Sequence, residues 1–148
     1  MPTIEETLVY PENDALELDE EWSFVQNKKN KRWGWFAKSR VTKQIVAYFS
    51  GNRNQESCEE FKKRFPDKYK DTFTFSDLWE SYSNVFTENH LSAPKGSGET
   101  CHIENFNNII RQRLARYKRK TIAFSKSDYW HDLITRLFII QYNLSLRI

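Results

Sequence analysis

The sequence predicts a single α/β domain in which a mixed, five-stranded β-sheet is flanked by helices. Segments that alternate between apolar and polar residues fill much of the first half of the chain, and segments with apolar residues three and four positions apart dominate the second half. The chain has 148 residues, enough for one domain with a hydrophobic core, and 16% of them are aromatic. These observations favour a folded domain over a disordered chain.

Three consecutive strands open the predicted domain. They cover residues 16–25, 32–40 and 44–51, and polar turns at 27–31 and 41–43 separate them. Short connections of this kind join antiparallel neighbours, so this part of the chain is predicted to form an antiparallel meander.

The first of these strands carries acidic residues on one side. Alternation gives it an apolar side, with Leu18, Trp22 and Phe24, and an acidic side, with Glu17, Asp19, Glu21 and Ser23. Crowded carboxylates repel one another, and a bound cation would relieve that repulsion. The alternative is an edge strand whose acids lie in water.

The remaining elements alternate between helix and strand. The sequence predicts a helix at 54–65 that Pro66 ends, then a strand at 72–75 and a short helix at 78–82. A strand at 84–91, a loop at 92–98 and a long helix that begins near Glu104 follow. The last predicted element is a terminal helix from residue 128, whose apolar face consists of Trp130, Leu133, Ile134, Leu137, Phe138 and Ile140. Asp77 directly follows the fourth strand, which is where α/β proteins usually place their sites. Its alternative role is to cap the short helix that follows.

The long helix combines one acid with a dense basic run. Glu104, Asn108, Arg111 and Ala115 share one stripe, and an apolar stripe of Ile103, Phe106, Ile110, Leu114 and Tyr117 lies beside it. The basic residues are Arg111, Arg113, Arg116, Lys118, Arg119 and Lys120. An acid that binds a metal ion, followed by basic residues that bind a polyanion, would explain this order. The alternative is an amphipathic helix with a solvated charged face.

Charge is distributed unevenly along the chain. The first 21 residues hold eight acids and no Lys or Arg, although the net charge of the whole chain is +3. Residues 1–15 are therefore predicted to be an acidic, flexible leader, and residues 16–148 a basic domain. A basic domain with an acidic centre suits nucleic acid bound around a metal site.

Several other classes of protein are excluded. Cys58 and Cys101 lie far apart in the sequence, which argues against a zinc site or a disulfide scaffold and for free thiols in a reducing compartment. The sequence contains no glycine-rich phosphate loop. No apolar run reaches the roughly 20 residues that a membrane span needs, and the N-terminus does not resemble a signal peptide. A cytoplasmic protein without membrane contact is expected.

The predicted order of elements is that of a ribonuclease H-like domain. In that arrangement the first strand is central and the fourth lies beside it, so Asp19, Asp77 and Glu104 would meet at one place. Three carboxylates can hold two divalent ions for phosphodiester chemistry, and magnesium suits oxygen ligands.

Three segments carry a specific family resemblance: LDEEWSFV with KKNKRWGWFA within residues 18–37, FSDLWESY at 75–82, and IENFNNIIRQRLARYKRKTIAFSKS from residue 103 followed by His131-Asp132. With them the chain resembles transposases of the insertion-sequence-one family, in the DDE group of the retroviral-integrase superfamily. The similarity covers roughly residues 17–142. The chain differs from the usual family pattern at Leu78, where members of the family commonly have glycine, and at Asn105-Phe106, where they commonly have Arg-His.

The resemblance implies a catalytic and metal-binding triad of Asp19, Asp77 and Glu104, with Mg²⁺ as cofactor, Mn²⁺ as its substitute, and two ions when DNA is bound. It implies that Arg111 contacts DNA, and that the activity is cleavage of transposon ends followed by strand transfer. The expected partners are DNA, a second copy of the chain at synapsis, and an upstream DNA-binding portion, since the zinc-binding and helix-turn-helix region of the family has no match here. Two alternatives remain open, namely a ribonuclease H-like nuclease without strand transfer and a non-catalytic DNA-binding remnant.

Overall fold

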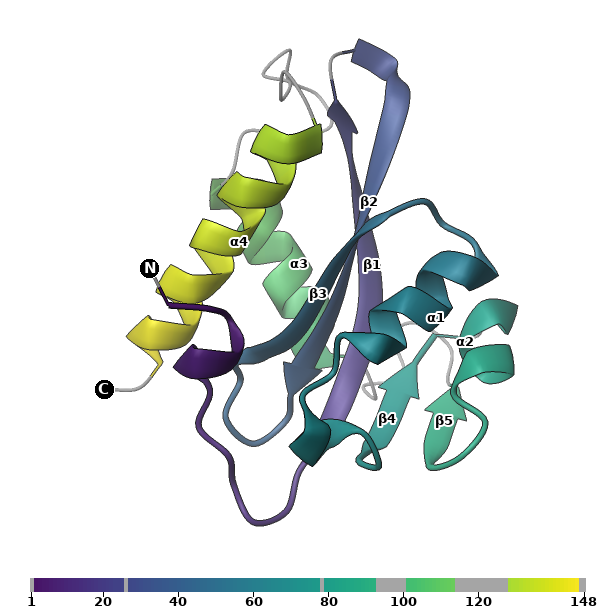
Figure 1. The fold of residues 1–148 in the computed structure, drawn as a ribbon, viewed down its shortest axis with the longest axis vertical. Coiled ribbons are helices and arrows are strands. Elements are labelled where there is room, and N and C mark those ends of the chain that lie inside the picture. The colour runs from purple at the N-terminus through teal and green to yellow at the C-terminus, as the bar shows by residue number, and fades with distance from the viewer. Residues whose placement is uncertain (1, 26, 78, 93–100, 114–127, 147–148) are drawn as a thin grey trace.

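A five-stranded mixed sheet with helices on both faces forms the fold in the computed structural model, which describes residues 2–25, 27–77, 79–92, 101–113 and 128–146 (Figure 1). The strands are β1 (Ala15–Val25), β2 (Asn27–Ser39), β3 (Ile45–Gly51), β4 (Phe73–Ser76) and β5 (His90–Ser92). The α-helices are α1 (Gln55–Lys63), α2 (Glu80–Val85), α3 (Cys101–Arg113) and α4 (Asp128–Ser145), and short 3-10 helices lie at η1 (Glu5–Thr7) and η2 (Asp67–Tyr69).

The strand order is β3-β2-β1-β4-β5, so β1 is the central strand. β1 pairs antiparallel with β2, which pairs antiparallel with β3, and the predicted meander is confirmed. On its other side β1 pairs in parallel with β4, from Ala15 opposite Phe73 to Glu17 opposite Phe75. The alternative of β1 as an edge strand with acids in water is therefore wrong.

Two hydrophobic cores hold the helices to the sheet. The first lies on the face covered by α1 and α2, where Trp35 is fully buried and packs against Phe61 and Tyr82. The second lies on the face covered by α3 and α4, where Phe36 packs against Phe106 (Figure 1). In this second core Ile103, Phe106 and Ile110 are fully buried, so the predicted apolar stripe of the long helix is confirmed as far as the structure describes it.

Two predictions about local structure are wrong. Residues 27–31 belong to β2 and do not form a turn. Residues 84–91 do not form one strand, because α2 extends to Val85 and β5 begins only at His90. Tyr82 and Phe86 are four positions apart, which is a helical spacing, and burial of Phe86 against Phe61 and Phe65 of the α1 segment favours the helix over the strand.

The buried face of α4 also differs in part from the prediction. Trp130 is 52% exposed, whereas His131, Thr135, Ile139 and Asn143, each four residues after the last, are fully buried. Polar residues are tolerated there because they are hydrogen-bonded: Asn143 accepts a bond from the Ile45 N–H of β3 and donates one to the Ile45 carbonyl. His131 is thus a packed residue of α4.

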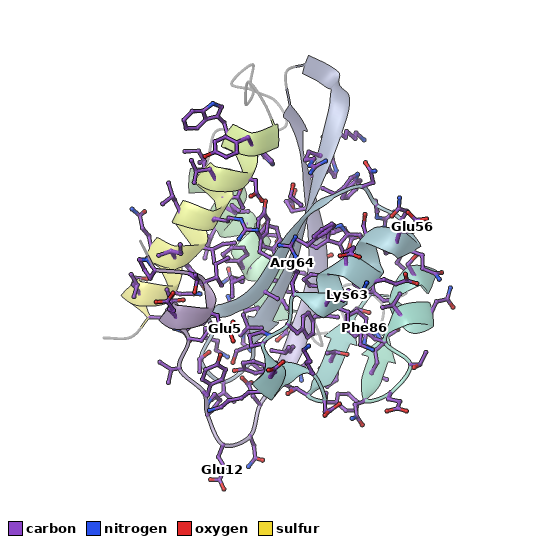
Figure 2. The ribbon with its side chains drawn as sticks, viewed as in Figure 1. Glu5, Glu12, Glu56, Lys63, Arg64 and Phe86 are labelled. Carbon is purple, nitrogen blue, oxygen red and sulfur yellow. The ribbon has the colours of Figure 1, made fainter. Side chains whose placement is uncertain are left out.

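The acidic N-terminal segment contacts the domain before it reaches β1. Thr7 and Leu8 are buried, and the Asn143 side chain donates to the Thr7 hydroxyl. Glu12, in contrast, is exposed at the tip of the connection to β1 and points away from the domain (Figure 2). Across the described residues, none of the helices combines the length and apolar character that a membrane crossing requires.

Candidate active site

A cavity of about 550 Å³ opens beside β1, next to the end of β4. Its lining comes from β1, β2, α3, the turn after β3 and the turn after β4, and consists of Asp19, Glu20, Glu21, Trp22, Trp33, Arg53, Asp77, Glu104, Asn107 and Asn108. The three acids predicted from the sequence, Asp19, Asp77 and Glu104, all lie in this lining, although they come from three separate elements.

Asp19 is buried, and both of its carboxylate oxygens accept hydrogen bonds. Oδ1 accepts from the backbone N–H of Glu20 at 2.9 Å, and Oδ2 accepts from Nδ2 of Asn107 on α3 at 3.0 Å. These bonds fix the rotation of the carboxylate, and the bond to Asn107 also joins the central strand to α3.

Asp77 follows the last residue of β4, and the parallel register explains its proximity to Asp19. Glu17 lies opposite Phe75, so the residues two positions further along each strand, Asp19 and Asp77, lie at the same level. Oδ1 of Asp77 accepts a hydrogen bond from the N–H of Trp79 at 3.0 Å. Because α2 begins at Glu80 and Trp79 is its N-cap residue, Asp77 orders the turn before the helix and does not cap it.

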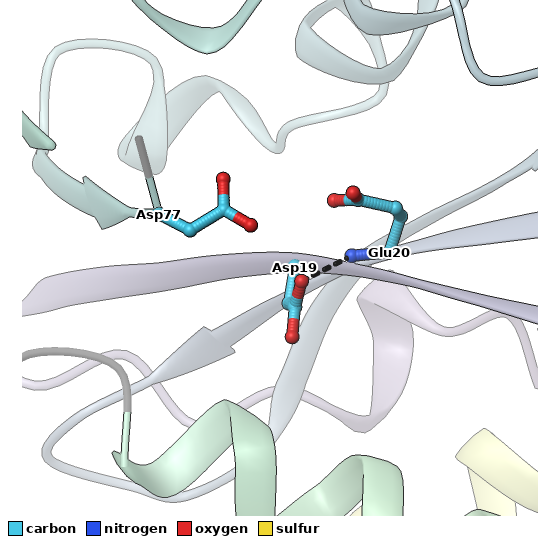
Figure 3. A group of neighbouring side chains, drawn as sticks. All are labelled: Asp19, Glu20 and Asp77. Atoms are coloured by element: carbon cyan, nitrogen blue, oxygen red, sulfur yellow. Dashed lines mark hydrogen bonds between the residues drawn. The ribbon is translucent and has the colours of Figure 1, made fainter. Parts of the chain in front are cut away.

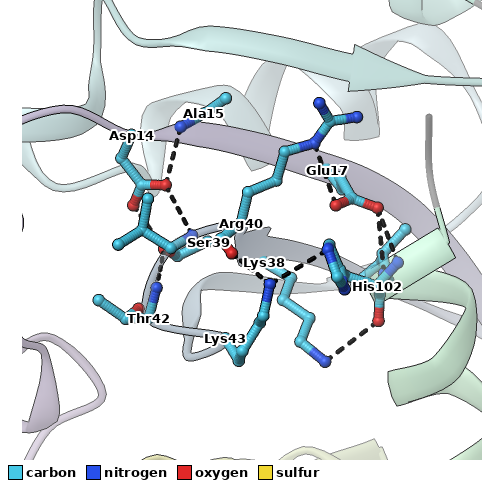
Figure 4. Close-up of polar contacts among 11 residues, drawn as sticks. Asp14, Ala15, Glu17, Lys38, Ser39, Arg40, Thr42, Lys43 and His102 are labelled. Carbon is cyan, nitrogen blue, oxygen red and sulfur yellow. Dashed lines mark hydrogen bonds and ion pairs between the residues drawn. The ribbon is translucent and has the colours of Figure 1, made fainter.

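Glu104 lies in the first turn of α3, and a buried carboxylate of β1 holds that end of the helix (Figure 4). Oε1 of Glu17 accepts hydrogen bonds from the backbone N–H groups of His102 at 2.9 Å and Ile103 at 3.4 Å. Oε2 of Glu17 accepts from Nε of Arg40 at 3.1 Å. A helix N-terminus attracts negative charge, so Glu17 fixes the start of α3 and with it the position of Glu104.

Glu20 is a fourth acid of the cavity that the sequence did not identify. It points to the face of β1 opposite Asp19, where its Oε1 accepts from Nε of Arg53 at 2.9 Å and its Oε2 accepts from the Tyr82 hydroxyl at 2.6 Å. Burial, followed by the charges of Glu20 and Asp19, raises the pKa of Tyr82 well above 10, so its hydroxyl remains a donor. An acid between Leu18 and Trp22 on the apolar side of a strand was the signal that could have revealed it.

Three of these carboxylates are close enough to share a cation. One ligand oxygen from each of Asp19, Glu20 and Asp77 lies within 4.8 Å of the other two, and Glu20 and Asp77 point toward each other (Figure 3). A site that offers only carboxylate oxygens suits Mg²⁺ or Mn²⁺ better than a softer metal. Glu104 lies outside this group of three but reaches the same cavity from α3.

The other candidate residues are placed less completely. Arg111 and Arg113 end α3, but their side chains lie outside the described part of the structure, as do residues 114–127 with Arg116, Lys118, Arg119 and Lys120. Their contact with DNA remains a prediction.

Cys58 is a free, buried thiol, and burial raises its pKa to about 12, which argues against a reactive role. The side chain of Cys101 lies outside the described residues.

The aromatic residues near the cavity differ in burial. Trp35 is a fully buried core residue. Trp22 and Trp33 are half-buried and line the cavity, with ring centroids 6.4 Å apart, and Trp33 also packs against the first core.

Comparison with known proteins identifies one family and several insertion-element proteins that are similar to this chain. The family described as IS1 transposase matches residues 15–144. Among curated proteins, insertion element iso-IS1n protein InsB of Shigella dysenteriae is 38% identical over 124 residues, which cover 83% of this chain and 92% of that protein. Insertion element IS1 protein InsB of Shigella flexneri is 31% identical, over 81% of this chain and 89% of that protein. Insertion element IS1 4 protein InsB of Escherichia coli K12 is 30% identical, over 85% of this chain and 75% of that protein.

Proposed function

Because the chain belongs to the IS1 transposase family, we propose that it cleaves the ends of an insertion element and joins them to target DNA, with Asp19, Asp77 and Glu104 as its catalytic acids. The single observation that carries this proposal is the cavity beside β1, where these three acids converge from β1, the turn after β4 and α3. The strand order with β1 at its centre supports a ribonuclease H-like fold. We propose Mg²⁺ as the cofactor, with Mn²⁺ as its substitute.

The residues around the acids support this chemistry by limiting their movement. Asp19 is bonded through both oxygens, and Asp77 through one, so their remaining lone pairs point in fixed directions. Glu104 is positioned through its helix, whose first turn is bonded to Glu17. Two divalent ions bound by these acids would activate the attacking water or 3′-hydroxyl and stabilise the leaving oxygen.

The substrate and its surroundings follow from the same proposal. Arg111, Arg113, Arg116, Lys118, Arg119 and Lys120 would contact the DNA backbone and so contribute affinity without reading the base sequence. Because synapsis brings two element ends together, a second copy of the chain is the expected partner in the DNA complex. We place the protein in the cytoplasm, where bacterial DNA is found.

The first test is manganese binding measured by water-proton relaxation, because it requires no knowledge of the DNA substrate. The intact chain is compared with Asp19→Asn, Asp77→Asn, Glu104→Gln and Glu20→Gln. Weaker binding in the first three variants is the expected result, and the Glu20→Gln result shows whether Glu20 shares the ions. A folded protein whose binding is absent, or indifferent to all four changes, overturns the proposal for this chain.

The second test is the DNA product. A labelled duplex that ends in the element's own terminal sequence is incubated with a target plasmid and Mg²⁺. Joined DNA that disappears in the Asp77→Asn variant is the expected result. Nicks without joining would instead identify a nuclease, and DNA binding without either product would identify a non-catalytic DNA-binding protein.

A further inference from the structure

Arg53 is the one basic residue in the described lining of the acidic cavity. Five acids line the same space, namely Asp19, Glu20, Glu21, Asp77 and Glu104. A DNA phosphate that enters such a cavity is repelled by each of them, and a fixed cation on the wall reduces that repulsion.

The turn between β3 and α1 holds Arg53 rigidly. The carbonyl of Asn52 accepts a hydrogen bond from Nε1 of Trp35 at 3.0 Å, and the Asn54 side chain caps α1 by accepting from the N–H of Ser57. The backbone on both sides of Arg53 is thus anchored: Asn52 is bonded to the core residue Trp35, and Asn54 caps the N-terminus of α1.

The guanidinium of Arg53 is oriented on two sides. Its Cζ lies 4.4 Å from the ring centroid of Trp79 and 5.3 Å from that of Trp33, and its Nε donates to Oε1 of Glu20 at 2.9 Å. The side chain is nevertheless 38% exposed, and within the described residues its terminal Nη nitrogens make no hydrogen bond. Stacking and the bond to Glu20 therefore fix the group, while the two terminal nitrogens remain available.

A role limited to neutralising Glu20 explains only part of this geometry. An arginine whose role is to neutralise a buried carboxylate binds it most strongly in a bidentate pair, in which two guanidinium nitrogens donate to the two carboxylate oxygens. Here Arg53 contacts one oxygen through Nε, and Tyr82 occupies the other. The two terminal nitrogens, which can together donate to a phosphate, thus make no hydrogen bond to the described residues, and Arg53 lines the cavity.

We propose that Arg53 is a phosphate-binding residue of this site, whose Nη nitrogens donate hydrogen bonds to a backbone phosphate of DNA beside the catalytic acids. The inference deepens the proposed function and rests on it, because the ligand is the same DNA. Glu20 then has a second role, since it holds the guanidinium in the orientation that the phosphate requires.

The test is the salt dependence of DNA binding. Fluorescence anisotropy of a short fluorescein-labelled duplex is measured with Ca²⁺ in place of Mg²⁺, which allows binding to be read without cleavage. The variants are Arg53→Gln, Arg53→Lys and the control Arg64→Gln, which removes an exposed arginine of the α1 segment that does not line the cavity. Arg53→Gln should weaken binding about tenfold at low salt and lower the slope of log K against log salt by about one. Arg53→Lys should retain the slope but lose part of the affinity, and Arg64→Gln should match the intact chain.

Removal of Arg53 also leaves the Glu20 carboxylate unpaired, and that charge by itself would repel DNA. Variants that lack the charge of Glu20 separate this repulsion from the loss of a phosphate contact. Glu20→Gln and the double variant Glu20→Gln/Arg53→Gln are measured in the same way. The amide oxygen introduced by Glu20→Gln can still accept the bond from Nε of Arg53, so the guanidinium keeps its orientation while the charge of Glu20 is lost. If Arg53 contacts phosphate, the slope therefore falls by about one when Arg53 is removed in the Glu20→Gln background as well. A slope that changes only while Glu20 is charged, or that changes in neither background, overturns the phosphate-binding role.

The manganese measurement distinguishes this inference from the proposed function. Arg53→Gln should still bind Mn²⁺, because none of the catalytic acids has been altered. An intact chain that binds DNA and responds to Asp77→Asn, together with an unchanged slope in Arg53→Gln, rejects the role of Arg53 alone. An intact chain that binds neither DNA nor Mn²⁺ rejects both.

Discussion

Asn107 on α3 donates a hydrogen bond from its Nδ2 to Oδ2 of Asp19 on β1, at 3.0 Å, and both side chains are buried. Asn107 lies three residues after Glu104 and lines the same cavity. This one bond therefore relates two of the proposed catalytic acids, because it fixes the carboxylate of one and the helix that bears the other.

Asn107→Ala should impair the site more than the fold. Without its donor, the Asp19 carboxylate can rotate, and loss of such a supporting bond typically costs 10- to 100-fold in metal affinity or activity. The expected loss of stability is only about 1 to 2 kcal/mol. Manganese relaxation and urea unfolding measure the two effects, with Asn105→Ala as the control because Asn105 is exposed on the same helix. Equal manganese affinity in the two variants would contradict the role given to Asn107.

Glu17→Gln should reduce both stability and metal binding. Its neutral amide would weaken the charged interactions with the α3 N-terminus and with Arg40, for a loss of about 1 to 3 kcal/mol in the free energy of unfolding. Because α3 carries Glu104, manganese affinity should fall as well. Glu104→Gln is the matched comparison: it should weaken manganese binding without a loss of stability. A Glu17→Gln protein with the thermal midpoint of the intact chain would contradict the structural role of Glu17.

Tyr82→Phe should destabilise the domain through the carboxylate of Glu20 rather than through packing. The ring contacts with Trp35 and Trp79 are retained in phenylalanine, whereas the 2.6 Å bond to Glu20 is lost. A cost of about 1 to 3 kcal/mol is expected for a buried charged partner. A double-mutant cycle with Glu20→Gln, followed by urea unfolding, isolates the interaction. If the two single effects simply add, the hydroxyl and the carboxylate are not coupled.

Much of the architecture could be predicted because hydrophobic periodicity reports it directly. The strands of the meander and the stripe with Phe106 follow from apolar spacing, which is a local property. The end of α2 and the extent of β5 could not be predicted, because Phe86 fits either a strand or a helix until its contact with Phe61 is known. On α4, the burial of Asn143 depends on a bond to Ile45, almost a hundred residues away in the sequence.

The same distinction applies to the candidate site. Asp19 and Asp77 could be identified because each has a local signal, an acid on a strand or at its end. Asn107 and Arg53 had no such signal, since one is a polar helix residue and the other lies in a turn. Their roles depend on which side chains the fold places opposite them, and single-sequence patterns do not contain that information.

His90 should make the domain less stable as the pH falls. Its ring nitrogens are hydrogen-bonded to the hydroxyls of Thr74 at 2.6 Å and Ser76 at 2.9 Å, the latter directly before Asp77, and its ring stacks on Phe86. Burial lowers the pKa of His90 from 6.5 to about 4. In the unfolded chain the imidazole takes up a proton below about pH 6.5, whereas in the folded chain it remains neutral down to about pH 4.

The unfolded state therefore binds more protons between these two pH values, so the contribution of His90 to stability is complete above pH 6.5 and is lost progressively toward pH 4. Urea midpoints should fall over this range in the intact chain and fall less in His90→Gln. Burial also lowers the pKa of His102, so His102→Gln is measured alongside to separate the two contributions. Titration of the His90 imidazole by NMR checks the cause directly. A folded-state pKa near 6.5 would show that the ring is open to water and that another group produces any loss of stability.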